Sequence, residues 1–440
     1  IKENLSKMLG NSENLLNFKK DLIYENLYIT AIFFLVSAPF ISSLILILIL
    51  ALNLNISIKS FKQNKVNYLL IIILILMISS CIDKSINQKT ILEGIDPFLT
   101  WISLINWIPL FLLFLGSQKF LNSKSKRERI MKVICFGTVP LIVSGIGQYF
   151  FNWNGPFKFL NGLIIWYQRP ILGEVGILAN GISGLTGLFN NANTAADWLL
   201  VVIPMQIYFL IKKNSSYIEK IFFFTLTSLS VLSLILTNSR SSILGFAGVV
   251  TFLLNSKLIL LVVTFSFLTI FISYIFNISF VNNLINLLKI EYLKSLFLGL
   301  ISDPRFDIWR NALNFIFARP IFGYGAASIG ILYSLKNLGT VFHVHNIFGE
   351  LAIIYGIPTA VLTTFFISNI FIKLVKVFPI KDFFKKKLKD LDNTWILSTI
   401  LIVYTQIIDF TYYDYRISLI FWILLSGLNS IKDKEKVIIE

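Results

Sequence analysis

The sequence predicts an all-α polytopic membrane protein with about 12 transmembrane helices, and three observations lead to this fold class. Hydrophobic residues make up 56% of the 440-residue chain and charged residues only 14%, outside the range of soluble globular domains. The mean hydropathy is +0.76. Apolar runs of about 15–25 residues recur along the chain, and each is long enough to cross a bilayer core.

The expected spans follow one another with mostly short polar connections. The first two form either one long helix through Pro39 or a short helical hairpin. A hairpin places Lys59, Lys62 and Lys65 on the same side as the N-terminal segment, and all later loops then alternate consistently. We therefore expect the hairpin, with both termini cytoplasmic. The spans cover residues 27–38, 40–54, 67–82, 98–116, 131–151, 195–211, 220–237, 241–254, 257–276, 346–372, 395–409 and 415–430.

The net charge of +16 is distributed as expected for a membrane protein. With this topology most Lys and Arg residues fall on the cytoplasmic side, whereas Asp and Glu divide about evenly between the two sides. This asymmetry follows the positive-inside rule. The basic runs at 119–132 and 373–389 are interpreted as topology signals and contacts to anionic lipid, rather than as a nucleic-acid interface.

The same topology divides the chain into segments. We expect a cytoplasmic N-terminal segment, nine helices with an outer loop at about 152–193, a large extracytoplasmic loop, three further helices and a cytoplasmic tail. Long loops concentrate function in compact proteins. The cytoplasmic loops contain no nucleotide-binding motif, which argues against an ATP-driven transporter. The segments cover residues 1–26, 27–276, 277–345, 346–430 and 431–440.

The large loop contains short predicted helices. Residues 280–300 have an amphipathic pattern, typical of a helix that lies along the membrane interface. Asp303 suits an N-cap and Pro304 a first helical position, so a second helix should start there and end near Ala318. Arg305 then lies in the first turn, where a helix N-terminus and a guanidinium form an anion site. The alternative is that Arg305 pairs with a neighbouring aspartate.

A second arginine stands in the short outer turn between two spans, at Asn238-Ser239-Arg240-Ser241. One interpretation is that Arg240 extends to the membrane interface. The other is that it faces a polar cavity and holds a phosphate, with Ser239 or the neighbouring serines as additional donors.

The only two histidines of the chain, His343 and His345, close the large loop. Histidine exchanges protons near neutral pH. His345 precedes a helix expected to begin at Asn346, and Glu350 lies one turn inside that helix, where it can orient a histidine. A metal site needs more ligands than this pair offers, so the hypothesis is a general base.

These segments, in this order, resemble the O-antigen ligase and O-antigen polymerase superfamily of bacterial membrane glycosyltransferases. The family's G-x-F-x-N-P-N segment is similar to residues 187–193, with Ala192 in place of the proline. The S-R turn matches at Arg240. The R-x-x-x-W and P-x-x-G-x-G segments match from Arg305 to Gly325, and H-x-H-N with the following E and G matches from His343 to Gly356.

The resemblance implies a glycosyltransferase of the bacterial cytoplasmic (inner) membrane with its active site facing the periplasm. It takes a glycan from an undecaprenyl-pyrophosphate carrier and passes it to an acceptor hydroxyl, with no metal or other cofactor. The acceptor is lipid A–core for a ligase and another glycan for a polymerase, and the sequence leaves both open. The expected partners are this donor, this acceptor and membrane lipids, and no nucleic acid.

The resemblance also assigns roles to the polar residues. His345 would be the general base, and Arg240 and Arg305 would stabilise the departing pyrophosphate. Trp166 and Tyr167 either stack on sugar rings or belong to an interfacial aromatic belt. Further expected substrate-binding residues are His343, Arg310, Arg169, Asn193, Ser239, Glu350 and Trp309.

Two alternative functions predict different sequence features. A metal-dependent glycosyltransferase would use acidic ligands, and Asp83, Glu93 and Asp96 are available but scattered. An anion transporter, for example of bicarbonate, would need polar residues deep inside several spans. The charges near the later spans, such as Asp197 and Asp409, instead cluster near the predicted helix ends.

Overall fold

The computed structural model describes residues 20–52, 67–87, 96–170, 184–213, 215–254, 305–339, 341–377, 383–385 and 387–431. Several features predicted from the sequence lie outside these residues, among them the span at 257–276, the amphipathic helix at 280–300, the Asp303-Pro304 helix start, Glu93, the three lysines Lys59, Lys62 and Lys65, and most of the two terminal segments.

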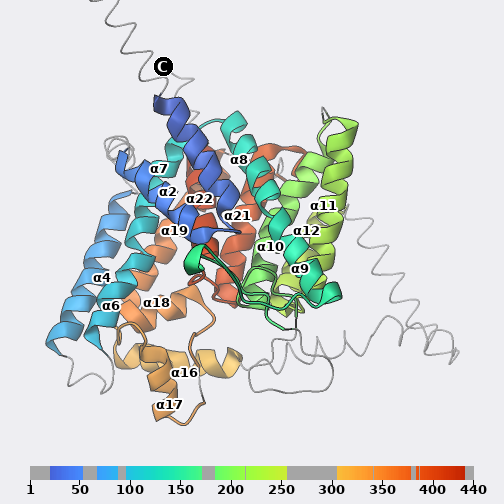
Figure 1. The fold of residues 1–440 in the computed structure, drawn as a ribbon. Helices are drawn as coiled ribbons and strands as arrows, with labels where there is room; N and C mark the ends of the chain where they lie inside the picture. The colour runs from blue at the N-terminus through green and yellow to red at the C-terminus, as the bar shows by residue number, and fades with distance from the viewer. Residues whose placement is uncertain are drawn as a thin grey trace, which may run out of the picture.

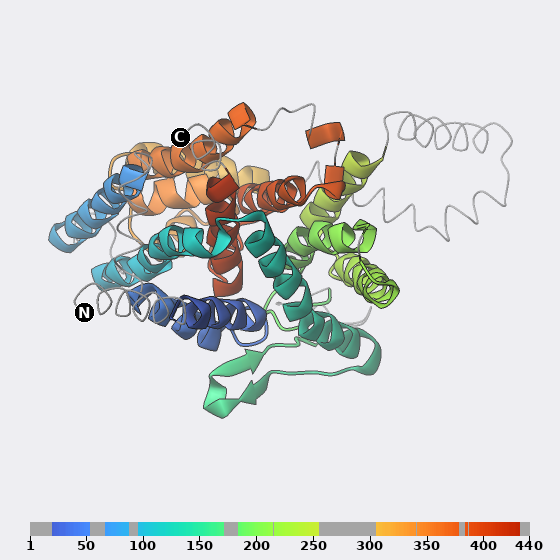
Figure 2. The same ribbon diagram turned by 90° about the horizontal axis from the view of Figure 1, so that it is seen from above.

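Most of the described residues are helical, and most of the helices form one bundle (Figure 1). α22 lies in its middle (Figure 2), and each of its residues from Arg416 to Ile431 is buried. The helices are α2 (Pro39–Leu52), α4 (Tyr68–Ile86), α6 (Pro97–Ser103), α7 (Ile108–Leu121), α8 (Lys124–Gly137), α9 (Val139–Phe151), α10 (Ala192–Ile211), α11 (Tyr217–Leu236), α12 (Arg240–Leu253), α16 (Arg305–Ala318), α17 (Ser328–Leu335), α18 (Ile347–Tyr355), α19 (Ile357–Val377), α21 (Leu391–Ile408) and α22 (Tyr415–Ile431).

Within the described part of the chain, seven helical segments are long and apolar enough to cross a membrane. Three shorter apolar helices, α2, α12 and α22, accompany them. The chain is therefore a polytopic, mainly α-helical membrane protein, as predicted. The number of about 12 spans and their orientation stay predictions. The seven segments are Tyr68–Ile86, Pro97–Leu121, Lys124–Phe151, Ala192–Ile211, Tyr217–Leu236, Ile357–Val375 and Leu391–Ile408.

The first described residues form the predicted helical hairpin. A helix over residues 20–34 is followed by a turn and by α2. The Ser42 hydroxyl donates to the Ala31 carbonyl at 2.8 Å. In one continuous helix these two residues would be about 16 Å apart along the axis, so the chain must fold back between them. The hairpin is confirmed, and the alternative of one long helix through Pro39 is wrong.

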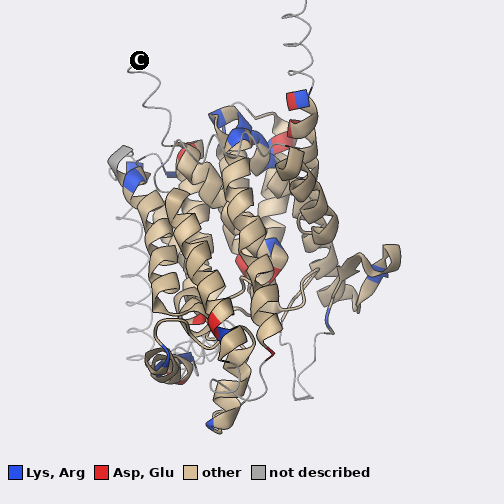
Figure 3. Cartoon of the chain, turned by 90° about the vertical axis from the view of Figure 1, so that its left-hand side faces the viewer, with Lys and Arg blue, Asp and Glu red and all other residues tan. Residues whose placement is uncertain are grey.

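Basic side chains gather at one end of the bundle (Figure 3), which we call the basic end. Lys119 at the end of α7 pairs with Asp21 at 2.7 Å, so the first described helix starts here. Arg127 of α8 is only 1% exposed and pairs with Asp392 of α21 at 2.7 Å. A buried arginine of this kind needs its partner, because an unpaired charge in the protein interior is costly.

The opposite end carries α16 and α17, which lie outside the bundle (Figure 1). We call it the site end. A short antiparallel β-hairpin, β1 (Phe157–Phe159) and β2 (Ile164–Trp166), also lies at the edge of the bundle (Figure 2). The sequence predicted an outer loop in this region of an all-α fold, so the strand pair is a correction. Apart from Lys158, its strand residues are aromatic or β-branched, which favours paired strands. Trp166 Nε1 donates to the Ser37 carbonyl at 2.9 Å.

The expected single span at 346–372 is wrong, because it consists of two helices, α18 and α19, that meet at Gly356. The loop after α16 takes up the carbonyl groups freed by this break. The amides of Tyr324 and Gly325 donate to the last carbonyls of α18, at 2.6 and 3.0 Å, and the Ile357 amide donates to Pro320 at 2.7 Å. The P-x-x-G-x-G segment, residues 320–325, thus connects the loop after α16 to the junction of α18 and α19.

We expect Gly356→Ala to destabilise the protein strongly. Gly356 has φ of 95°, and an added Cβ would lie 1.9 Å from the Ile321 carbonyl oxygen. A non-glycine residue in such a conformation costs about 1–3 kcal/mol before the clash is counted. Thermal unfolding of the detergent-solubilised protein measures the effect. Gly248→Ala in α12 is the matched control, because its Cβ would meet no atom within 4 Å; equal melting temperatures of the two variants would contradict the prediction.

Candidate active site

The His343–His345 segment is held in a defined conformation at the site end. Asn346 caps α18 as predicted, since its side chain accepts from the Gly349 amide at 3.0 Å. His345 itself has φ of 56°, a left-handed conformation that is uncommon for a non-glycine residue. Its Nδ1 lies 3.2 Å from Oδ1 of Asp409, the residue that follows α21. Asp409 is buried, whereas the imidazole is partly exposed.

The same carboxylate also holds the arginine of the predicted anion site. α16 is described from Arg305 to Ala318, which confirms the predicted end of this helix. Nη2 of Arg305 lies 3.3 Å from Oδ2 of Asp409, and its Nη1 donates to the Ile408 carbonyl at 3.0 Å. One buried carboxylate therefore fixes a histidine through one oxygen and an arginine through the other.

Glu350 orients a histidine, and this histidine is His343. The Glu350 carboxylate is 2% exposed, accepts from the Val344 amide at 3.0 Å and lies 3.3 Å from Nδ1 of His343. Each histidine of the pair thus has a carboxylate of its own. Trp309 of α16 fastens the segment further, because its Nε1 donates to the Val344 carbonyl at 2.8 Å.

Arg240 is the first residue of α12, and the serines around it face different ways. Ser239 and Ser242 are buried, and the Ser242 hydroxyl donates to Asp197 of α10 at 2.8 Å. Thr411 donates to the other oxygen of Asp197, also at 2.8 Å. The exposed Arg240 side chain makes no hydrogen bond or ion pair with any residue that the structure describes. It is therefore available to a ligand.

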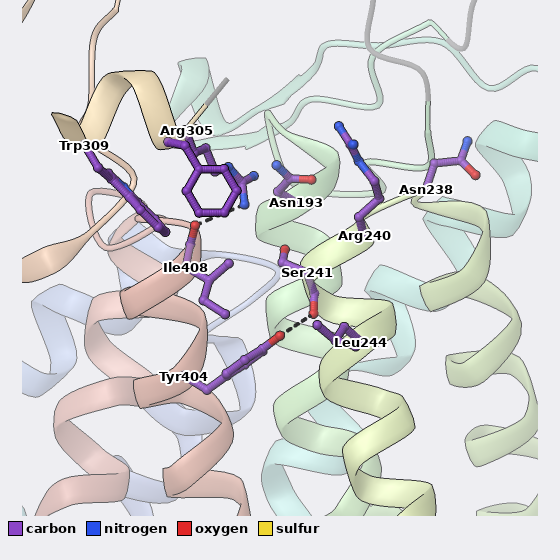
Figure 4. Close-up of a pocket in the computed structure, with 10 residues that line it drawn as sticks. Asn193, Asn238, Arg240, Ser241, Leu244, Arg305, Trp309, Tyr404 and Ile408 are labelled. Atoms are coloured by element: carbon purple, nitrogen blue, oxygen red, sulfur yellow. Dashed lines mark hydrogen bonds between the residues drawn. The ribbon is translucent and has the colours of Figure 1, made fainter. Parts of the chain in front are cut away.

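Arg240 and Arg305 line one cavity of about 360 Å³, which we call the arginine cavity. Figure 4 shows the two arginines on opposite sides, from α12 and α16, with Asn193 between them. Deeper in the cavity the Tyr404 hydroxyl donates to the Ser241 carbonyl at 3.0 Å. The walls combine polar and apolar groups: Asn193, Asn238, Arg240, Ser241, Leu244, Arg305, Phe306, Trp309, Tyr404 and Ile408.

Both histidines line a second cavity of about 460 Å³, which we call the histidine cavity. It shares Asn193 with the arginine cavity. Asp409 lines the histidine cavity and forms an ion pair with Arg305, which lines the arginine cavity. This carboxylate therefore lies at the boundary between the two cavities. The lining residues are Pro39, Tyr167, Asn190, Asn191, Asn193, Thr194, His343, His345, Asp409, Phe410, Thr411, Tyr413, Asp414, Tyr415 and Arg416.

Four expected substrate-binding residues line neither cavity, and one of them is Glu350, the buried partner of His343. Ser239 is buried behind the wall of the arginine cavity. Arg169 lies beside the histidine cavity and donates through Nε to Asn190 Oδ1 at 2.7 Å. Arg310 is exposed on α16 and makes no hydrogen bond or ion pair with a described residue. The structure thus brings together Arg240, Arg305, Asn193 and the histidines, and leaves Arg310 apart.

The contacts of Asp409 and Asp197 were not predictable from the sequence, in which both residues are only charges near the ends of predicted spans. One signal for their roles was available in the sequence: the predicted topology places both aspartates at the same end of the bundle as the two arginines and the histidines. Asp409 is also followed by a polar and aromatic turn, from Thr411 to Tyr415, between two apolar spans. From the sequence alone, a charged residue at such a helix end can be interpreted either as a site residue or as a side chain exposed to solvent.

The acidic residues considered as metal ligands have other partners. Asp83 pairs with Lys84 at 2.9 Å and with Arg319 at 2.8 Å. Asp96 caps α6 by accepting from the Phe98 amide at 2.9 Å. Among the described residues no group of three or more His, Cys, Asp and Glu side chains is arranged to hold a metal ion.

The fold and this site define a class: a multi-pass helical membrane protein with two arginines and two histidines gathered at one end of the bundle. Residues 223–364 match the family model described as O-antigen ligase. The matched segment contains Arg240, Arg305 and His345, and it confirms the resemblance to the O-antigen ligase and polymerase superfamily. The match supports a membrane glycosyltransferase of the ligase or polymerase type. No curated protein matches the chain.

Proposed function

We propose that the protein is an O-antigen ligase, which transfers a glycan from an undecaprenyl-pyrophosphate carrier to a hydroxyl of lipid A–core. The observation that carries this proposal is the pair of contacts made by Asp409, to Nδ1 of His345 at 3.2 Å and to Arg305 at 3.3 Å. A base and a cation held by one carboxylate, at the boundary of two cavities, suit a reaction in which an acceptor loses a proton while an anion departs.

The arginine cavity supports a pyrophosphate leaving group. Arg240 and Arg305 approach it from two helices, and Arg240 is the first residue of α12. Guanidinium groups bind phosphate oxygens through two parallel hydrogen bonds, and helix N-termini favour anions. Both interactions strengthen as charge develops on the departing phosphate, which is the condition for lowering the barrier. Leu244, Phe306 and Ile408 add apolar wall for the start of the lipid.

The contact with Asp409 gives His345 the tautomer that a base requires. When Nδ1–H donates to the carboxylate, the lone pair of the neutral imidazole lies on Nε2. In the proposed reaction Nε2 takes the proton of the acceptor hydroxyl, and the acceptor oxygen forms the new bond to the anomeric carbon. The bond from that carbon to the pyrophosphate oxygen breaks, and the arginines receive the negative charge.

The orientation of the chain is part of the proposal. The site end would face the periplasm and the basic end the cytoplasm of a bacterial inner membrane, with about 12 spans and both termini inside. The positive-inside rule supports this direction, because the buried and surface arginines and lysines of α7 and α8 lie at the basic end.

A deletion strain tests the function. We expect its glycolipids, separated on a gel, to show lipid A–core without polymer, while carrier-linked glycan accumulates. Core bearing a single repeat would instead identify a polymerase of the same superfamily. Normal glycolipids with impaired inorganic-carbon uptake would contradict transfer altogether and support anion transport. Restoration of the polymer by the plasmid-borne wild-type gene is the control.

A further inference from the structure

We propose that the β-hairpin of β1 and β2 is a membrane anchor, whose turn inserts into a phospholipid surface at the boundary of headgroups and acyl chains. The hairpin comprises residues 157–166 and lines neither cavity. This inference is independent of the proposed function, because it concerns a surface outside the candidate active site and holds for any reaction there.

The first argument is the position of the hairpin. It follows shortly after the end of the membrane-spanning segment Lys124–Phe151, of which α9 is the second half. Figure 2 shows the two strands projecting sideways from the bundle, and Figure 1 shows the same segment level with the site end of α9, whereas α17 lies beyond the bundle. A segment that projects sideways at this level leaves the protein where the ends of the spanning helices meet lipid headgroups.

The second argument is the continuity of the exposed apolar surface from α9 to the hairpin. Phe136, Val143 and Phe150 follow one another at intervals of seven residues on this spanning segment, so they lie on one face, and all three are exposed. On a membrane-spanning helix, lipid covers such a face. The chain then turns back against α9, because the Trp153 amide donates to the Gly147 carbonyl at 3.1 Å. The apolar surface of α9 therefore leads directly into the hairpin.

The third argument is the composition of the turn. Turns on a water-exposed surface are usually built from polar residues, glycine and proline. In this hairpin the turn carries Leu160 and Leu163, whose side chains are 62% and 48% exposed. Lys158 is the only charged residue among residues 149–166. Its long side chain reaches phosphate oxygens while the strand lies in the apolar boundary. One cation among exposed leucines and aromatic rings suits a phospholipid surface.

The fourth argument sets the depth of insertion. The base of the hairpin is fixed, because Trp166 Nε1 donates to the Ser37 carbonyl and the Gly155 amide donates to the Gln168 carbonyl, each at 2.9 Å. A two-stranded hairpin is only marginally stable in water, and lipid at the turn supplies a further supporting surface. The strand edges carry backbone N–H and C=O groups that find no partners in the hydrocarbon core. The turn therefore lies about 5–10 Å into the boundary, the depth typical of interfacial helices.

The test uses the full chain with a cysteine in the turn, Leu160→Cys, labelled with an environment-sensitive fluorophore in nanodiscs of phosphatidylethanolamine and phosphatidylglycerol. The native Cys81 and Cys135 are buried, so the label attaches to the introduced thiol. Quenching is measured with a nitroxide on the fifth carbon of the lipid acyl chain and, separately, with iodide in water. The matched control is Leu335→Cys on α17, where the leucine is 67% exposed. We expect the nitroxide to quench the Leu160→Cys label about threefold more than the control label, and iodide to show the opposite order.

Leu163→Cys provides a second label in the same turn and should give the same result, including when Leu160→Cys folds poorly. Two results would overturn the inference. Quenching of the turn labels by iodide as strongly as the Leu335→Cys label would place the hairpin in water. Protection of the turn labels from both quenchers would place the hairpin against protein, such as a second copy of this chain. The measurement needs neither donor nor acceptor, so failure of the proposed function is seen separately, in the glycolipids of the deletion strain.

Discussion

Replacing His345 by alanine should abolish glycan transfer while the protein still inserts into the membrane and binds its donor. The proposed base is lost, and a general base contributes about 10²–10⁴ to a rate. Donor binding should persist because the arginines line a different cavity from the histidine. Single-turnover transfer by the purified variant measures the first effect, and retention of radiolabelled donor measures the second.

His343→Ala is the matched control for this experiment. His343 lines the same cavity and has its own carboxylate, Glu350, but it lacks the contact with Asp409. We expect a smaller loss, expressed mainly in the KM for acceptor. A fully active His345→Ala protein would exclude His345 as the base, and a more severe defect in His343→Ala would exchange the roles of the two histidines.

Arg305→Ala should reduce transfer by about 10²–10³, the typical loss when one stabilising donor of a developing negative charge is removed. Arg305→Lys should also be damaging, because a lysine supplies a point charge and not the two parallel N–H groups of a guanidinium. Initial rates at saturating donor measure both. The lysine variant is the more informative one, since it keeps a positive charge near the buried Asp409.

Arg310→Ala is the matched control on the same helix. Arg310 is exposed, lines neither cavity and has no hydrogen-bond or ion-pair partner among the described residues. We expect wild-type rates within about twofold, as for surface substitutions away from a site. Wild-type activity in Arg305→Lys would show that only the charge matters, and it would contradict bidentate phosphate binding.

The fold class followed from the sequence because the bilayer imposes it. Every backbone polar group in a membrane must be paired internally, so long apolar runs become helices with few alternatives. The same reasoning failed at Gly356, where the expected span is broken. There the freed carbonyls of α18 are bound by amides of a loop about 30 residues earlier in the chain, and local sequence carries no sign of such a partner.

The chemistry of the site was also readable from the sequence in part. His345, Arg305 and Arg240 stand out because charged and ionisable residues are costly at a membrane boundary and therefore attract a functional explanation. The same argument made Arg310 and Ser239 candidate site residues, but neither of them lines a cavity. Whether a residue lines a cavity depends on its exact position along the helix and on the face of the helix that carries it.

By itself, the sequence determined the membrane-spanning helical class, the start of α18 after its cap Asn346 and the residue types available for chemistry, because hydropathy and capping are local properties. Only the tertiary structure decided which carboxylate serves which histidine. Asp409 lies 64 residues beyond His345 and meets it through the packing of α18 against α21. Such pairing depends on how helices pack, and helix packing is determined by side chains far apart in the chain.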